Sequence, residues 1–344
     1  MDGRGGASEA SVRASIAGFI AAVVLMLLVY GGSDALRNFD AALIGYATAT
    51  ILLTFGVVYR YAMWVQTPPT RRYLVKGWQA FFSLRNFWRF PTMVPRGLFW
   101  YLGLQTFIKK RGTGRWLAHQ ALFWGVMIAT LMTFMLAWGW VHFEATPSQD
   151  YEMFVFGLKV ITFEPFSVWG WITFHGLDLA AVLVIAGCGY FVWRRVRDRQ
   201  ATSGQRLGYD FVPLIALIAI SSTGLLLTFS SALLNGEGYE FLAILHMGVV
   251  VLSLIFIPFG KFFHVVQRPA TVGVTMFKQT SQASRGIVRC VRCDEPLEGA
   301  AFVENLQETM DELGLRYRGL VETCPRCKRV ERGRAYLERV KRGF

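Results

Sequence analysis

The sequence is poor in acidic residues, histidine and cysteine. Its 344 residues include 23 acidic residues against 36 Lys and Arg residues, with five histidines and five cysteines. It also has no internal repeat and no low-complexity tract, which argues against a repeat protein or a low-complexity chain. The few histidines and cysteines can therefore be considered one by one.

Long apolar runs are what the sequence has instead. It is 53% hydrophobic and 15% aromatic, with a mean hydropathy of +0.37. Six runs of roughly 20 residues, the length that a bilayer core requires, carry few or no charges; they cover about 15–31, 41–65, 116–141, 169–193, 210–233 and 241–265. Because the first run lacks a clear small-residue cleavage site, we expect a retained helix and not a signal peptide. The predicted fold class is all-α and integral to a membrane, with a six-helix transmembrane bundle.

The net charge of +13 is distributed loop by loop. Residues 66–115 contain ten basic residues and no acidic one, and 194–209 contain five arginines. Residues 142–168 contain four acidic residues and one lysine, and the charged residues of 234–240 are two glutamates. This alternation follows the positive-inside rule, so 66–115 and both termini are expected on the cytoplasmic side of a prokaryotic inner membrane. The charge therefore sets topology, and no nucleic-acid partner is expected.

Four segments follow from these patterns: an N-terminal transmembrane helix in 1–40, a five-helix bundle in 41–268, a polar linker in 269–285 and a small cytoplasmic domain in 286–344. In the last segment, apolar residues at helical spacing predict a helix over about 302–313 and a second near 330–342. The inner loop 66–115 interleaves aromatic rings with Arg and Lys. That composition suits either a segment at the membrane surface, in contact with lipid, or a docking platform for a partner protein.

Two histidines, His246 and His264, lie eighteen residues apart at the two ends of the last apolar run. On one continuous helix this spacing spans about 27 Å and five full turns, so both imidazoles would lie on one face near opposite membrane surfaces. His119 opens the third run near the cytoplasm, and His175 lies early in the fourth run near the outer surface. The four form two depth-matched pairs, His119 with His264 and His175 with His246, as two bis-histidine haems b would need. For any single one, the alternative is a core histidine hydrogen-bonded to a backbone carbonyl.

The run from Leu245 to His264, which ends Pro-Phe-Gly-Lys-Phe-Phe-His, resembles the last helix of the nitrate reductase gamma-subunit family. This family of membrane cytochromes b includes subunits of heterodisulfide reductase, of the sulfite-reduction complex and of some membrane-attached hydrogenases. The motif Arg115-Trp-x-x-His119 is similar to the start of the family's second helix, and the resemblance covers roughly 41–268. It implies that His119 and His264 hold a haem b near the cytoplasm. It also implies electron exchange between menaquinone or ubiquinone and an iron–sulfur partner, such as a hydrogenase, nitrate reductase or heterodisulfide-reductase-like module.

The sequence departs from the family pattern at the outer haem. The family usually places a second histidine ten residues after the first on the same helix, and here that position is Ala129. Either His175 supplies the missing ligand, or the outer haem is absent and His246 is a relic or a quinone ligand.

Two further polar residues are candidates for handling protons at a quinone site. Asp178 follows His175 by three residues and shares its helix face. It could orient His175, accept a proton from a quinol, or form a packing hydrogen bond with a neighbouring hydroxyl; the hydroxyls considered are Ser221, Ser222 and Thr223. His142, at the end of the third run, is expected at the outer interface, with a role at the quinone as the alternative.

Four of the five cysteines form two C-x-x-C knuckles separated by thirty residues: Cys290, Cys293, Cys324 and Cys327. Four thiolates in this pattern suit tetrahedral coordination of a metal, either a structural zinc or an iron centre. A disulfide framework is not expected, because the set lies on the reducing side of the membrane. The small domain is expected to depend on its metal for folding. The fifth, Cys188, is expected to be a core residue of the fourth run.

These features predict an electron-transfer subunit with two haems b, in which the cofactors and not the side chains carry the chemistry. The alternative is a membrane transporter or receptor whose zinc-knuckle tail binds a partner. Against that alternative, the sequence has no inverted repeat and no pair of helices broken by Gly or Pro at mid-membrane.

Overall fold

A computed structural model of the chain describes residues 3–198, 207–315 and 318–341. The chain divides into two compact units. The first, the bundle unit, comprises Met1–Ala62 and Gln105–Val266. The second, the cysteine unit, comprises Met63–Leu104 and Gln267–Phe344.

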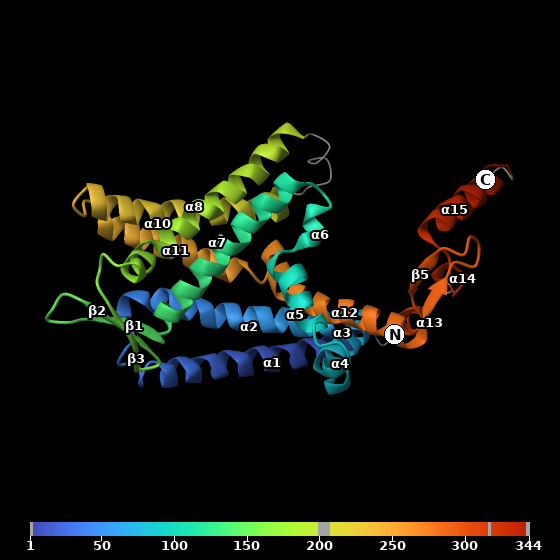
Figure 1. Cartoon of the computed structure of the whole chain (residues 1–344), viewed down its shortest axis with the longest axis horizontal. Helices are drawn as coiled ribbons and strands as arrows, with labels where there is room; N and C mark the ends of the chain where they lie inside the picture. Colours follow the sequence, from blue (N-terminus) through green and yellow to red (C-terminus); the bar gives the residue numbers. More distant parts are fainter. Residues whose placement is uncertain (1–2, 199–206, 316–317, 342–344) are drawn as a thin grey trace. The chain divides into compact units, whose positions relative to one another are not determined.

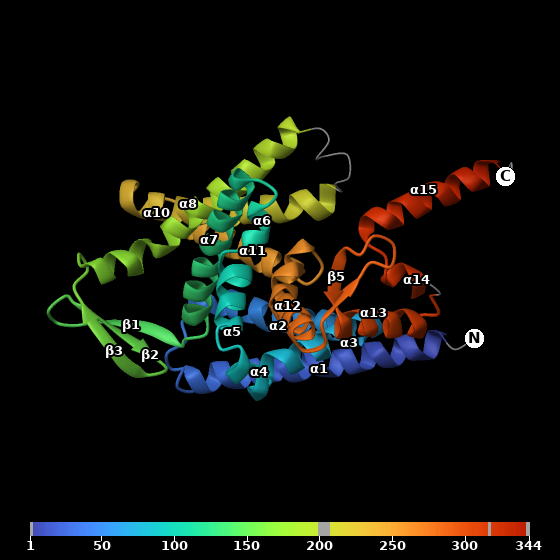
Figure 2. The same cartoon turned by 45° about the vertical axis from the view of Figure 1, so that its right-hand side comes forward.

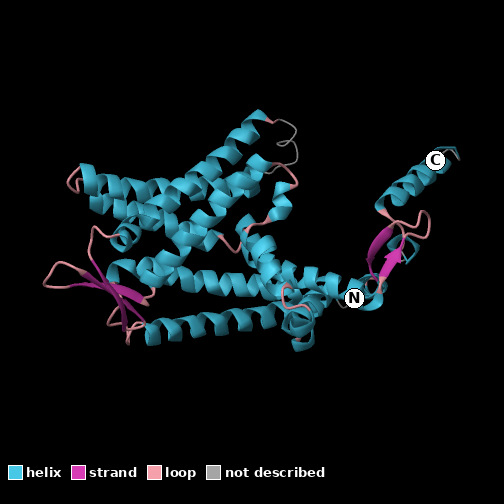
Figure 3. Cartoon of the chain, in the orientation of Figure 1, coloured by secondary structure: helices cyan, strands magenta, loops and turns pink. Residues whose placement is uncertain are grey.

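The long apolar runs form helices, as predicted (Figures 1, 2 and 3). Within the described residues, six helices are long and apolar enough to cross a membrane. They are α1 (Gly3–Gly32), α2 (Ile44–Gln66), α7 (Thr113–Ala137), α8 (Val168–Arg197), α10 (Val212–Leu233) and α11 (Tyr239–Phe256). The prediction of a helical, multi-pass membrane protein is confirmed at this level.

Small residues let α7 and α8 approach closely. A Cβ atom added to Gly125 of α7 would lie 2.8 Å from the carbonyl oxygen of Ala180, and one added to Gly187 of α8 would lie 2.7 Å from that of Ala118. Helices in lipid associate through such close contacts, because burying apolar side chains gains little there. Cys188 of α8 is fully buried beside Leu214 of α10, as expected for a core residue.

A second apolar cluster joins α2, α11 and the end of α7. Tyr46 and Ala49 of α2 are buried with Ala137 of α7 and with Val250 and Leu254 of α11. Because α8 contacts α7 and α10, and α10 contacts α11, the five helices α7, α8, α10, α11 and α2 follow one another around the bundle.

The segment 142–168, predicted as an outer loop, contains a small antiparallel sheet. Its strands β1 (Val141–Ala145), β2 (Tyr151–Val155) and β3 (Leu158–Phe163) pair in chain order. The sheet lies at the end of the bundle unit where α7 ends and α8 begins (Figure 1). Gly139 makes the turn from α7 into β1, with a φ of +66° that favours glycine. The fold is therefore not purely helical.

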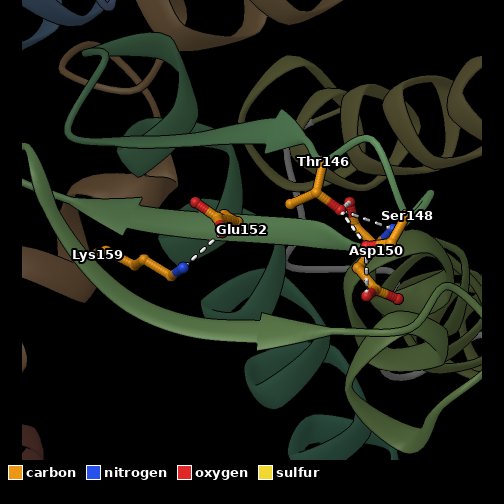
Figure 4. Close-up of polar contacts among 5 residues, drawn as sticks. All are labelled: Thr146, Ser148, Asp150, Glu152 and Lys159. Atoms are coloured by element: carbon orange, nitrogen blue, oxygen red, sulfur yellow. Dashed lines mark hydrogen bonds and ion pairs between the residues drawn. The ribbon is translucent and has the colours of Figure 1, made fainter.

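Polar side chains fix the two hairpins of this sheet (Figure 4). In the turn between β1 and β2, the Asp150 N–H donates to Oγ1 of Thr146 at 3.1 Å, and the Ser148 hydroxyl donates to the Asp150 carboxylate at 2.9 Å. Across β2 and β3, Lys159 pairs with Glu152. These contacts are local, so they define the hairpins without help from the helices.

The last apolar run is not one helix, which corrects the geometry predicted for His246 and His264. Helix α11 ends at Phe256, a turn covers 257–260, a 3-10 turn covers Lys261–Phe263, and α12 (His264–Arg285) begins at His264 itself. Pro258 has no N–H to continue the helix. The argument that eighteen residues make five turns of one helix therefore does not apply, and the two imidazoles do not share a continuous helix face.

Arg60 of α2 stabilises this break. Its guanidinium donates to the carbonyl oxygens of Pro258 and of Gly260, the latter at 3.1 Å, and lies 4.4 Å from the ring centroid of Phe263. Carbonyls at the end of a helix lack partners within it. The half-buried Arg60 side chain therefore satisfies carbonyls that the broken helix exposes.

The cysteine unit contains most of the predicted inner loop and the C-terminal segment. Its helices are α3 (Pro68–Phe82), α4 (Leu84–Arg89), α5 (Met93–Gly97), α12, α13 (Ala300–Glu312), α14 (Arg318–Val321) and α15 (Pro325–Lys341), with strands β4 (Ile287–Arg289) and β5 (Pro296–Gly299). The predicted linker 269–285 is thus part of a helix, whereas the helices predicted near 302–313 and 330–342 are confirmed.

Glycines also explain why α3 and α12 pack together. A Cβ atom added to Gly77 would lie 2.9 Å from the backbone of Gly273, and the reverse substitution is equally close. Arg72 of α3 then pairs with Glu308 at 2.7 Å and Glu312 at 2.9 Å on α13. Much of the loop predicted as part of 41–268 accordingly packs with the C-terminal segment, which does not form a unit by itself.

Candidate metal centre and histidine sites

The four knuckle cysteines come together in the cysteine unit, as the sequence predicts. A tight turn after β4, in which Asp294 has a φ of 59°, holds Cys290 and Cys293. Cys324 directly precedes α15, and Cys327 lies in its first turn. The four Sγ atoms all lie within 4.8 Å of one another.

Backbone N–H groups are aimed at the sulfur atoms. The Cys324 N–H donates to Sγ of Cys290 at 3.2 Å, and the Cys327 N–H donates to Sγ of Cys324 at 3.4 Å. The first of these bonds lowers the pKa of Cys290 to about 6. Conversely, the Cys324 and Cys293 thiols beside Cys327 raise its pKa to about 12. One thiolate is therefore stabilised in a group where further thiolates repel one another unless a cation lies between them.

The donor set fits a tetrahedral metal ion. Zinc–sulfur bonds of about 2.3 Å imply sulfur–sulfur distances of about 3.8 Å in a tetrahedron. Sγ of Cys293 and Sγ of Cys324 lie 3.6 Å apart, close to that value. Cys290, Cys293, Cys324 and Cys327 could hold a zinc or iron ion through thiolate bonds, which would connect the β4–β5 turn to α15.

His246 lies between α10 and α2. Its Nδ1 atom is 2.8 Å from Oγ1 of Thr223, and its ring centroid is 6.5 Å from that of Tyr46. The Thr223 hydroxyl also lies 2.8 Å from the carbonyl oxygen of Ala219 and 3.1 Å from that of Ile220. When it donates to one of these carbonyls, it can accept a proton from Nδ1, and Nε2 then keeps the lone pair that a metal would use.

His175 is linked to α10 through Asp178. Its Nδ1 atom lies 3.4 Å from one carboxylate oxygen of Asp178, and the other carboxylate oxygen accepts a hydrogen bond from the Thr228 hydroxyl at 2.7 Å. Asp178 therefore contacts His175 and a threonine at once, so two of the predicted roles coexist. The threonine is Thr228, which sequence reasoning did not name; Thr223, which it did name, contacts His246 instead.

The other two candidate ligands lie in helix turns. Nδ1 of His264 donates to the carbonyl of Lys261 at 2.6 Å, which places the proton on Nδ1. His119 lies in the second turn of α7, with its ring edge-on to Phe191 of α8 at a centroid distance of 6.5 Å.

Helix direction sorts the histidines by depth. His175 and His246 are each the eighth residue of α8 and of α11. Helix α10 packs antiparallel to both α8 and α11, so α8 and α11 start at the same end of the bundle. A rise of 1.5 Å per residue places both histidines about 10 Å from that end. His119 is the seventh residue of α7 and lies toward the opposite end. The contacts with α10 differ in level, however: His246 contacts Thr223, whereas Asp178, three residues after His175, contacts Thr228, which lies five residues or about 7.5 Å further along α10. Equal counts from the helix starts therefore do not place the two rings at one level of the bundle.

His142 lies in the sheet, not in a helix. It is the second residue of β1, its ring stacks on Phe154 at 4.9 Å with an interplanar angle of 5°, and its Nε2 atom is 3.7 Å from a carboxylate oxygen of Glu144. The prediction placed it at the end of the third span, but α7 ends at Ala137. The alternating apolar residues of 141–145 and 151–155 were the sequence signal for these strands.

Comparison with known proteins does not identify a family for this chain. No family model, no curated protein and no solved structure matches this chain.

Proposed function

We propose that this chain is the haem b-containing membrane subunit of a quinone-linked oxidoreductase complex of the nitrate reductase gamma-subunit kind. In this role it transfers electrons between the quinone pool and an iron–sulfur-containing partner in the inner membrane. Haem b would supply a carrier that accepts and releases single electrons. The side chains would hold it and manage protons.

The observation that carries the proposal is an oxygen atom beside Nδ1 of three candidate ligands. Nδ1 of His264 faces the Lys261 carbonyl, Nδ1 of His246 faces the Thr223 hydroxyl, and Nδ1 of His175 faces the Asp178 carboxylate. Metal-ligating histidines usually make this bond, because it orients the ring and makes Nε2 a better donor. A single core histidine can have such a contact by chance. The same contact at three histidines on separate helices favours a shared role as metal ligands.

Helix direction supports two sites. His175 and His246 lie in the half of the bundle where α8 and α11 start, and His119 lies toward the other end. We assign His175 and His246 to the outer haem, and His119 and His264 to the inner one. The helix break before His264 means that its position depends on the Arg60 contacts and not on the spacing to His246.

The quinone site of this proposal is Asp178 with Thr228, beside the haem ligand His175. The Asp178 side chain is 23% exposed, so a quinone in the lipid can reach it. A carboxylate is energetically costly in a membrane helix, so its presence there is a sign of function. Asp178 is suited to accept a proton from a quinol. His142 stays the second candidate. The four-cysteine centre is assigned a structural role, with zinc as the first choice and iron as the alternative.

Absorption spectroscopy of the purified full chain tests the proposal. A dithionite-reduced b-type band is expected, with two haems per chain by the pyridine haemochrome assay. His119→Ala and His264→Ala should each remove one haem, and His175→Ala and His246→Ala the other. His142→Ala is the control and should keep both. A colourless protein overturns the proposal and favours the transporter or receptor alternative.

A further inference from the structure

An aromatic and basic face of the cysteine unit lies on α3 and α4. Val75, Trp78 and Phe82 share the side of α3 opposite the one that packs on α12, because they are spaced three and four residues apart. The inner side of α3 is buried through Leu74, Gly77 and Ala80. Helix α3 is therefore apolar on two sides. Within the described chain, the side with Val75, Trp78 and Phe82 is not covered by another segment.

The apolar side continues onto α4. Ser83 ends α3 and caps α4, with its hydroxyl oxygen accepting from the Asn86 N–H at 3.3 Å. Trp88 of α4 is 77% exposed and Phe82 is 70% exposed. The rings form ordered contacts, since Trp78 stacks on Phe82 at a centroid distance of 5.3 Å and 12°. We call the set Val75, Trp78, Phe82, Phe87 and Trp88 the aromatic face.

Basic side chains surround the aromatic face without acidic partners. Within the described part of the chain, Arg71, Lys76, Arg85 and Arg89 have no carboxylate at ion-pair distance, whereas Arg72 is engaged by Glu308 and Glu312. No acidic residue occurs anywhere between 66 and 115. The face thus presents uncompensated positive charge together with exposed rings.

We propose that the aromatic face binds the anionic headgroup layer of the membrane. The chain itself holds the face near that layer: α3 begins at Pro68, directly after the apolar helix α2 ends at Gln66. Segments that lie at a membrane interface place their aromatic rings at headgroup depth and their cationic side chains near the lipid phosphates. A soluble partner would leave large exposed rings in water whenever it was absent, whereas lipid is always present.

Fluorine NMR of the full chain in lipid nanodiscs tests this proposal. Tryptophan is labelled with fluorine, and Trp78→Phe and Trp88→Phe each remove one resonance, which assigns it. Trp124 of α7, which lies within an apolar span, is the internal reference for lipid. Tyr336→Trp on the exposed part of α15 provides the reference for water. A nitroxide on the lipid headgroup and a soluble gadolinium chelate are added in turn.

The Trp78 and Trp88 resonances should broaden with the lipid nitroxide and be protected from gadolinium, relative to the tryptophan introduced by Tyr336→Trp. The effect should be stronger with phosphatidylglycerol than with phosphatidylcholine alone. Removing Arg85 or Arg89 by substitution with Gln should weaken the local association about fivefold each, since a basic residue near an anionic surface contributes about that factor. Arg334→Gln on α15 is the charge-matched control and should change nothing.

Two results would overturn the proposal. Broadening of both resonances by gadolinium as strong as at position 336 would mean that the face is open to water. Protection from both probes would mean that a protein surface covers it. Trp88 is so exposed that Trp88→Phe is expected to fold even if Trp78→Phe does not, so the test does not depend on one variant.

Discussion

Nδ1 of His246 lies 2.8 Å from Oγ1 of Thr223, across the contact between α11 and α10. The same hydroxyl lies 2.8 Å from the Ala219 carbonyl oxygen of α10. With its proton on that carbonyl, the hydroxyl is an acceptor for Nδ1 of His246 and leaves Nε2 free to bind a metal.

Thr223→Val tests this relationship. The valine keeps the shape but removes the acceptor, so His246 loses the bond that orients it. Loss of such a partner typically weakens metal binding about 10- to 100-fold. For the outer haem of the proposed function, we expect faster loss during detergent washing and a shifted midpoint potential by redox titration. Thr54→Val is the control, because that hydroxyl bonds only within α2, to Thr50; equal behaviour of the two variants would contradict the assignment.

Arg60→Met should destabilise the break between α11 and α12. The substitution removes hydrogen bonds from a charged donor to the carbonyls of Pro258 and Gly260, each worth about 1.5–3 kcal/mol. A thermal melt of the purified protein should show a lower midpoint, and the inner haem that we propose at His264 should be lost first. Arg60→Lys should restore part of the effect. An unchanged melt would show that Pro258 alone maintains the break.

Asp178→Asn separates two roles of the carboxylate. If Asp178 accepts quinol protons, haem reduction by a quinol analogue should slow at least about 100-fold, the lower range for proton-transfer groups, with little change in haem potential. If it only orients His175, the potential should shift while the haem content falls. Stopped-flow reduction and potentiometric titration of the same sample distinguish these outcomes, and Thr228→Val should give a weaker form of the same effect.

Cys324→Ser should release the metal of the cysteine unit. Loss of one thiolate from a four-thiolate site removes a ligand that the remaining three cannot replace. Metal analysis of the purified chain should show one fewer zinc or iron ion per chain, and proteolysis should become faster between 286 and 344. Cys188→Ala, a change to a buried cysteine of α8, should leave the metal in place. Full metal content in the Cys324 variant would show that the cluster is not a metal site.

Gly77→Val should separate α3 from α12. Its Cβ would lie 2.9 Å from the Gly273 backbone, and overpacking of this kind costs about 1–3 kcal/mol. Limited proteolysis should then cut α3 or α12 more readily than in the parent protein. The control is Gly333→Val on α15, where an added Cβ meets nothing within 4 Å. Similar cleavage of the two variants would argue against close packing of α3 on α12.

The predictions that succeeded rest on local properties. Runs of about 20 apolar residues form helices because the length and hydropathy of a span are contained in the run itself. The two C-x-x-C knuckles could be recognised because the spacing within each one positions two sulfur atoms for a shared metal. The amphipathic helix near 302–313 follows from its own spacing.

The failures involve residues far apart in the chain. The sequence predicts one helix from 241 to 265, but Arg60, 198 residues before Pro258, satisfies the carbonyls that the break exposes. The segment 269–285 reads as a polar linker, but the small residue Gly273 lets it pack on Gly77 of α3.

The sequence by itself determined the membrane character, the six spans, the histidine inventory and the cysteine cluster. Only the tertiary structure decided that His246 and His264 lie on different helices, that Thr223 contacts His246 while Thr228 contacts Asp178, and that most of the inner loop packs with the C-terminal segment. The physical reason is the same in each case: helix length and thiol spacing depend on neighbouring residues, whereas a helix end or a hydrogen-bond partner depends on which distant backbone can approach.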